Sequence, residues 1–205
     1  MKSQILSLKP IKRFMALNKK LYLLAALAAT FGLVLGLVLA FSGGMESVIY
    51  SSTGSGLYEI IINDYSAFGL LAENLYRLLL PIIIIFLLSL SKYTSPLSYV
   101  YLGYQGCLLG ASIVGLISSN GVMGVLNAIV MVLPINVLNF VVLISALVVF
   151  LKRLSLALSQ RISLIHSLKI FMPKLVYVFV SALVVSMVYA FLYPLLLRSV
   201  IVINY

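Results

Sequence analysis

The sequence predicts an all-α membrane protein, a polytopic transmembrane helical bundle with about five spans. Of its 205 residues, 63% are hydrophobic and only 9% are charged, with a mean hydropathy of +1.22. A soluble domain of average composition has roughly half apolar and a quarter charged residues. The apolar residues here form segments of about 20 residues, the length that crosses a bilayer. We therefore expect one integral membrane domain over residues 1–205.

The first apolar segment, residues 21–41, follows an N-terminal stretch rich in lysine and arginine. This order also suits a secretory signal peptide, and Ala40-Phe41-Ser42 resembles a small-residue cleavage site. The apolar core of a signal peptide, however, is only about 7 to 15 residues long. We therefore expect an uncleaved membrane anchor.

Four further spans are predicted at residues 71–90, 99–117, 122–151 and 175–197. The fourth of these stretches corresponds to about 45 Å of helix, whereas the hydrocarbon core is about 30 Å thick. We expect a single long crossing that is tilted or broken at Pro134, rather than two full crossings.

Residues 152–174 form a basic and partly amphipathic segment between the last two spans. Leu154, Leu158, Ile162 and Ile165 recur at helical spacing. This pattern predicts a helix over about residues 154–168 that lies along the cytoplasmic membrane surface. The lone histidine, His166, is interpreted as an interfacial residue of this helix rather than as a ligand.

Charge is distributed unevenly over the predicted segments. Of the fourteen lysines and arginines, all except Arg77 and Arg198 fall on one side of a five-span arrangement, and the four acidic residues fall on the other. The positive-inside rule then predicts a cell-membrane protein with a cytoplasmic N-terminus and an external C-terminus. The net charge of +10 is explained by anionic lipid, which attracts juxtamembrane lysines by about 1 kcal/mol each. Membrane lipid, and not nucleic acid, is the expected partner.

The stretch VLNAIVMVLPINVLNF places three asparagines and a proline within an apolar run. Pro134 removes one backbone hydrogen bond and frees the carbonyl four residues earlier. In hydrocarbon such groups must find partners within the protein, and the side chains of Asn127, Asn136 and Asn139 can supply them. Two interpretations stay open: a kinked, packed helix joined by asparagines, or a discontinuous helix that lines a polar cavity or a partner-docking groove.

The third predicted span carries pairs of small residues that allow two helix backbones to approach closely. We expect this span to pack against the fourth, with Gln105 adding a polar group, and the first span to form a second close contact. Packing within the chain is favoured over dimerisation, although a homo-oligomer is left open. The glycines assigned to packing are Gly32, Gly36, Gly103, Gly106, Gly110 and Gly115.

The order of these segments, together with the motif Leu-Pro-Ile-Asn-Val-Leu at residues 133–138, resembles the stage II sporulation protein M family. The glycine-rich stretch GYQGCLLGASIVGLI at residues 103–117 is similar to the third span of that family. The similarity is best over residues 75–150. It implies a non-catalytic membrane scaffold whose partners are peptidoglycan-degrading proteins that drive engulfment of the forespore, although related members occur in organisms that do not sporulate. Contacts with such partners are expected on residues 42–66 or on the C-terminal tail.

An enzyme is the first alternative. Glu73 and Arg77 have a Glu-xxx-Arg spacing similar to that of the CAAX-type membrane proteases, but Ala72 stands where those enzymes pair a second glutamate. Their intramembrane histidines are also absent, since the single histidine lies outside the predicted spans. We interpret Glu73 and Arg77 as an i,i+4 ion pair at the outer end of the second span. No enzymatic activity, cofactor or metal site is predicted.

A transporter subunit is the second alternative. Small permease subunits are likewise basic on the cytoplasmic side and interrupted by proline and asparagine. Ionisable residues within spans usually mark the paths of ions, and this chain has almost none away from the span ends. The composition therefore disfavours an ion-coupled carrier, but it leaves open a permease that works with a separate ATPase.

Overall fold

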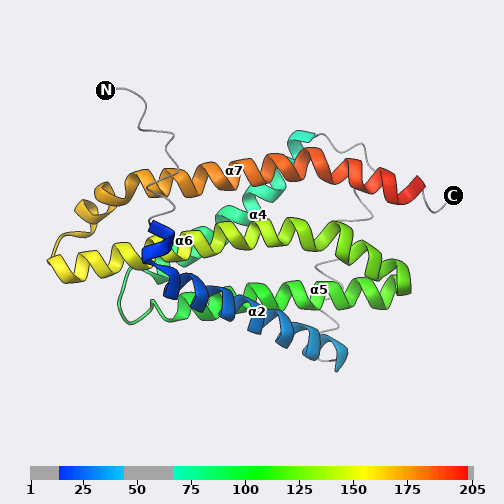
Figure 1. Cartoon of the computed structure of the whole chain (residues 1–205), viewed down its shortest axis with the longest axis horizontal. Helices are drawn as coiled ribbons and strands as arrows, with labels where there is room; N and C mark the ends of the chain where they lie inside the picture. The colour runs from blue at the N-terminus through cyan, green and yellow to red at the C-terminus, as the bar shows by residue number, and fades with distance from the viewer. Residues whose placement is uncertain (1–13, 44–66, 203–205) are drawn as a thin grey trace.

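The computed structural model describes residues 14–43 and 67–202, and every regular element within these ranges is helical (Figure 1). The elements are α2 (Lys19–Phe41), α4 (Ala67–Leu88), α5 (Leu97–Asn127), the π-helical segment η1 (Ala128–Val132), α6 (Leu133–Gln160) and α7 (Leu164–Val202). Each of the five α-helices contains a stretch long and apolar enough to cross a membrane. The predicted all-α, multi-pass architecture is confirmed.

Successive long helices run in opposite directions (Figure 1). We call the end of the bundle where α2, α5 and α7 begin and where α4 and α6 end the basic end. Eight lysines and arginines of the described residues lie in the turns and helix termini there, whereas Arg77 lies in the half of α4 near the opposite end. The eight are Lys19, Lys20, Lys92, Lys152, Arg153, Arg161, Lys169 and Lys174.

Helices α2 and α5 meet backbone against backbone. The buried residues of α2 are all small: Ala25, Ala29, Gly32, Gly36 and Ala40. A Cβ atom at Gly32 would overlap the backbone of Gly103, and one at Gly36 would overlap that of Cys107. From the other side, a Cβ at Gly106 or Gly110 would overlap carbonyls of α2. Lipid provides little hydrophobic drive for helix association, so this close van der Waals contact is what holds the pair together.

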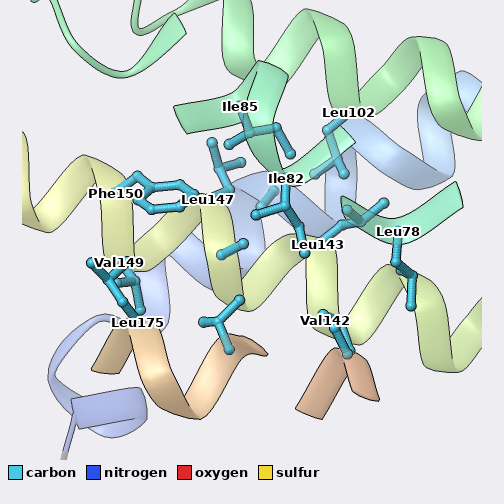
Figure 2. Packing of buried hydrophobic residues seen from close by; sticks show 14 of the residues in the cluster. Leu78, Ile82, Ile85, Leu102, Val142, Leu143, Leu147, Val149, Phe150 and Leu175 are labelled. Carbon is cyan, nitrogen blue, oxygen red and sulfur yellow. The ribbon is translucent and has the colours of Figure 1, made fainter. Parts of the chain in front are cut away.

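Large apolar side chains fill the space between the other helices. Ile82 of α4, Leu102 of α5 and Leu143 of α6 belong to one buried cluster, and their side chains lie close together in Figure 2. Phe86 and Phe150 add an edge-to-face ring pair with centroids 5.2 Å apart. The outward faces of α2 and α7 also carry large apolar side chains, such as Phe31 at 70% exposure. These faces suit contact with lipid.

The glycine prediction is corrected in one respect. Gly106 and Gly110 were expected to pack against the fourth span, but in the structure they pack against α2, together with Gly103. The close contact predicted for the glycines of the third span and the one predicted for those of the first span are therefore two sides of a single interface, between α2 and α5. The reason is geometric, because two backbones approach closely only where both helices present small residues, and α6 offers no such stripe toward α5.

The boundaries of the fourth and fifth spans also differ from the prediction. Gly121, with φ 55° and ψ −130°, separates two helices, so the chain breaks at the predicted turn of residues 118–121. Residues 122–127 follow this break and continue through η1 into α6, which extends to Gln160 and so ends later than the predicted residue 151. Helix α7 begins at Leu164, so the fifth span starts earlier than residue 175. Apolar composition alone does not locate these ends, since the residues on either side of each end are equally apolar.

The predicted interfacial helix over residues 154–168 is wrong. Residues up to Gln160 complete α6, Arg161 takes a left-handed conformation with φ 52° and ψ 31°, and α7 starts within three further residues. The Ser163 hydroxyl accepts a hydrogen bond from the backbone N–H of His166 at 3.3 Å, which caps the new helix. The helical spacing of the apolar residues did not reveal this reversal, because they belong to two different helices. Leu154 and Leu158 lie in α6, whereas Ile165 lies in α7.

We expect Gly32→Leu to disrupt the α2–α5 pair, because its side chain would collide with the α5 backbone, which has little freedom to move. The cost is about 1–3 kcal/mol or more of the free energy of unfolding. Thermal unfolding of the purified protein in mild detergent measures this loss. Val34→Leu is the matched control, since Val34 is 56% exposed on the same helix. Equal midpoints for the two variants would contradict the packing described above.

Candidate functional site

The break in the fourth predicted span lies one turn before Pro134. The π-helical turns of η1 end at Val132, and Pro134 occupies the first positions of α6. Since η1 runs directly into α6 and Val132 has a helical conformation, the chain stays helical here, and Pro134 removes one N–H donor from the backbone hydrogen bonds. The Nδ2 of Asn136 donates to the carbonyl of Val132 at 2.8 Å. The amide of Asn136 thus bonds the irregular backbone before α6. A bond to the interrupted backbone was one of the roles predicted for these asparagines.

Asn139 takes part in a second polar contact, which joins three helices. Its Nδ2 lies 3.5 Å from Oδ1 of Asn74 on α4, and Nδ2 of Asn74 donates to the Ser186 hydroxyl on α7 at 3.2 Å. Asn74 is 3% exposed and Ser186 is fully buried. We call these three residues the asparagine link. Since buried amides in a bilayer need partners, the link favours one arrangement of α4, α6 and α7.

One acceptor of the asparagine link is left over. The Oδ1 atom of Asn139 is buried and has no hydrogen-bond partner among the described residues. A buried unpaired acceptor costs about 1–3 kcal/mol. The two amides of the asparagine link therefore use only part of their capacity to form hydrogen bonds.

The predicted ion pair is present beside the asparagine link. Nη2 of Arg77 donates to Oε1 of Glu73 at 2.6 Å, across one turn of α4. The side chain of Arg77 is 59% exposed, so the pair lies on the outer surface of the bundle whereas the neighbouring Asn74 points inward. The two charges satisfy each other, as i,i+4 pairs on a helix do.

Gln105 forms its hydrogen bond within its own helix. Its Nε2 donates to the Tyr101 hydroxyl at 2.9 Å. Asn127 is the last residue of α5, and its side chain lies outside the described part of the structure. Gly115 is buried in α5.

Sequence reasoning missed three polar residues that the fold buries. Asn74 stands between charged neighbours in the segment AENLYR, and Ser186 is a lone hydroxyl in an apolar run, so neither gave a signal of its own. Arg153 was taken as the charged end of a span, yet it is 1% exposed within α6. Burial of these residues depends on which helices surround them, so it cannot be predicted from their neighbours in the sequence.

The basic end has its own contacts. Nη2 of Arg153 donates to the carbonyl of Ser89 at the end of α4, at 3.2 Å, and its guanidinium lies 5.2 Å from the ring centroid of Phe86. Nζ of Lys174 lies 4.5 Å from the ring of Phe14 and 4.2 Å from that of Phe171. The two contacts of Lys174 join the helical turn that precedes α2 to α7.

Comparison of the chain with protein-family models, curated proteins and solved structures found no match. Within residues 14–43 and 67–202, no group of three histidine, cysteine, aspartate or glutamate side chains forms a candidate metal site. The side chains of the asparagine link bond to one another, and those of Asn136 and Arg153 bond to backbone carbonyls. In chemical terms, this arrangement fixes helices relative to one another.

We expect Asn74→Leu to lower the free energy of unfolding by about 1–2 kcal/mol, because it removes both hydrogen bonds of the asparagine link. Asn139→Leu removes one of them and has a smaller effect. In a double-mutant cycle, the second substitution costs less once the first is present. Reversible unfolding in mixed detergent micelles measures both terms. Strictly additive losses would show that the two amides do not interact.

Proposed function

We propose that the protein is a non-catalytic scaffold of the stage II sporulation protein M type, which holds peptidoglycan-remodelling partners at the cell membrane. The observation that carries the proposal is the use of the intramembrane polar side chains. Asn136 bonds the backbone at the start of α6, and Asn74 joins Asn139 to Ser186 across three helices. A platform that positions other proteins needs a bundle with one defined arrangement, and such bonds favour it.

The motif that carries the resemblance supports the same proposal. Leu133–Leu138 forms the first residues of α6, where Pro134 follows the π-helical segment η1 and Asn136 bonds back to Val132. Pro134 and Asn136, the proline and the polar residue of the motif, therefore both shape the backbone of this helix. This is the use that a scaffold would make of it.

The proposed orientation places the basic end in the cytoplasm. Lysine and arginine flanking the spans favour the cytoplasmic side of a bilayer. The opposite end, with Ser42 and the start of α4, then faces the cell wall. The predicted partner-binding loop begins at Ser42, and its residues 44–66 lie outside the described part of the chain. Wall-remodelling partners would bind on this face.

Cysteine labelling tests the orientation. In a Cys107→Ala background, we expect Ser42→Cys to react with a membrane-impermeant maleimide in intact cells, because Ser42 is exposed at the external end. Tyr93→Cys, at a residue 89% exposed at the basic end, is expected to react only after permeabilisation. The reverse pattern would invert the proposed topology.

Affinity purification tests the function. We expect tagged protein, extracted from its native membrane in mild detergent, to retain secreted or membrane-anchored wall hydrolases. Replacing residues 46–64 with a glycine–serine linker of equal length should abolish their retention, because that segment is the proposed binding surface. Lys169→Gln at the basic end is the control and should leave it unchanged.

The same purification decides between the proposed scaffold and a permease. Co-purification of a cytoplasmic ATPase without any wall hydrolase would overturn the scaffold. The protein would then be a permease subunit, and the irregular backbone of η1 would be part of a transport pathway.

A further inference from the structure

Arg153 is the least satisfied group of the described chain. Its side chain is 1% exposed, and only Nη2 has a hydrogen bond, to the carbonyl of Ser89. Its Nε and Nη1 atoms are buried without a hydrogen-bond partner among the described residues. A guanidinium stays protonated in proteins and presents five N–H donors. A buried cation with unmet donors is costly, so its retention needs a reason.

The helix end beside it supplies only part of the compensation. The carbonyls at the C-terminus of α4 carry a partial negative charge, and Ser89 offers one of them to Arg153. The ring of Phe86 adds a cation–π contact at 5.2 Å. Neither group is an anion, and neither reaches the two unmet donors.

No carboxylate of the described residues can balance this charge. The only acidic residue in residues 14–43 and 67–202 is Glu73, which is in the half of α4 distant from Ser89 and is paired with Arg77. Around Arg153 the charges are instead positive. Lys152 precedes it and is half-buried, and Lys92, which is exposed, follows Ser89 by three residues. The missing counter-charge is therefore expected to come from outside the described residues.

The depth of Arg153 indicates which anion is available. Arg153 contacts Ser89, the residue that follows the end of α4, so it lies at the level where this span leaves the hydrocarbon core and the headgroup layer begins. Lys20 at the start of α2 and Lys92 after α4 lie at the corresponding ends of their spans. Phosphate is the anion of this layer, and the arginine fork matches its oxygens.

We propose that Arg153 binds a phosphate group at the basic end of the bundle, with Lys92 and Lys152 beside it, and that an anionic phospholipid headgroup supplies this phosphate. The carbonyl of Ser89, in the turn-rich connection of residues 89–96, contacts the guanidinium, and this connection would move outward to admit the ligand. It is held to α4 by the Thr94 hydroxyl, which donates to the carbonyl of Leu88 at 2.6 Å. Bound phosphate would satisfy Nε and Nη1 and fix this connection against α6.

Thermal unfolding of the full-length protein in neutral detergent tests the proposal. The probes are phosphatidylglycerol, phosphatidylcholine and inorganic phosphate, compared at equal ionic strength. We expect phosphatidylglycerol at 100-fold its Kd to raise the midpoint by about 5 to 10 °C, and phosphatidylcholine to have little effect. Inorganic phosphate should act weakly. An Arg153-dependent shift of equal size with inorganic phosphate would support the site with a free anion as its source.

Matched variants separate this site from general charge attraction. Arg153→Gln removes the cation but keeps a donor for the Ser89 carbonyl, so the contact with α4 can persist. It should abolish the shift caused by phosphatidylglycerol, whereas Lys169→Gln, which also removes one charge at this end, should retain it. A shift that persists in Arg153→Gln, or its absence in the wild-type protein, would overturn the proposal.

A second measurement applies if Arg153→Gln does not fold. Native mass spectrometry of the wild-type protein should show one phosphatidylglycerol retained in preference to phosphatidylcholine, with weaker retention in Lys92→Gln. Equal retention of the two lipids would refute a phosphate site. The outcome is independent of the proposed scaffold role, because it requires neither a protein partner nor a particular orientation.

Discussion

Inside a bilayer, every backbone or side-chain polar group must find its partner within the protein, and this constraint shapes the interior of the bundle. At the start of α6, Pro134 removes a backbone donor just after the π-helical segment η1, and the amide of Asn136 bonds the carbonyl of Val132 in that segment. Between α4, α6 and α7, two asparagines and a serine bond one another instead of water. The polar residues in the apolar run are therefore parts of the packing, placed where the helical pattern is interrupted or where helices meet.

Two different kinds of contact hold the helices together. Between α2 and α5, small residues allow the backbones to touch, and the contact extends along most of α2, from Ala25 to Ala40. Around α4, α6 and α7, large apolar side chains pack together, and the hydrogen bonds of the asparagine link favour one orientation of these helices relative to one another. The first kind tolerates almost no added volume, because the neighbouring atoms are backbone. The second kind adapts more easily, since side chains can change rotamer.

Charge is distributed differently at the two ends of the bundle. At the opposite end, Glu73 and Arg77 neutralise each other on the surface of α4. At the basic end, lysines and arginines accumulate without a described carboxylate, and Arg153 is buried among helix ends and an aromatic ring. A buried cation is strongly destabilising when its compensation is incomplete. The lipid headgroup layer can provide that compensation, which would make the membrane itself part of the folded structure at this end.

The sequence by itself determined what depends on local composition and spacing. Apolar length predicts the five crossing helices, i,i+4 spacing predicts the Glu73–Arg77 pair, and small-residue spacing identifies the glycines that allow close contact. Only the tertiary structure decided which helix those glycines face, that Asn74 and Ser186 meet Asn139, and that Arg153 is buried. It also replaced the expected interfacial helix by a three-residue reversal after Gln160. The physical reason is that contacts between helices depend on their mutual rotation and ends, whereas an apolar run looks the same along its whole length.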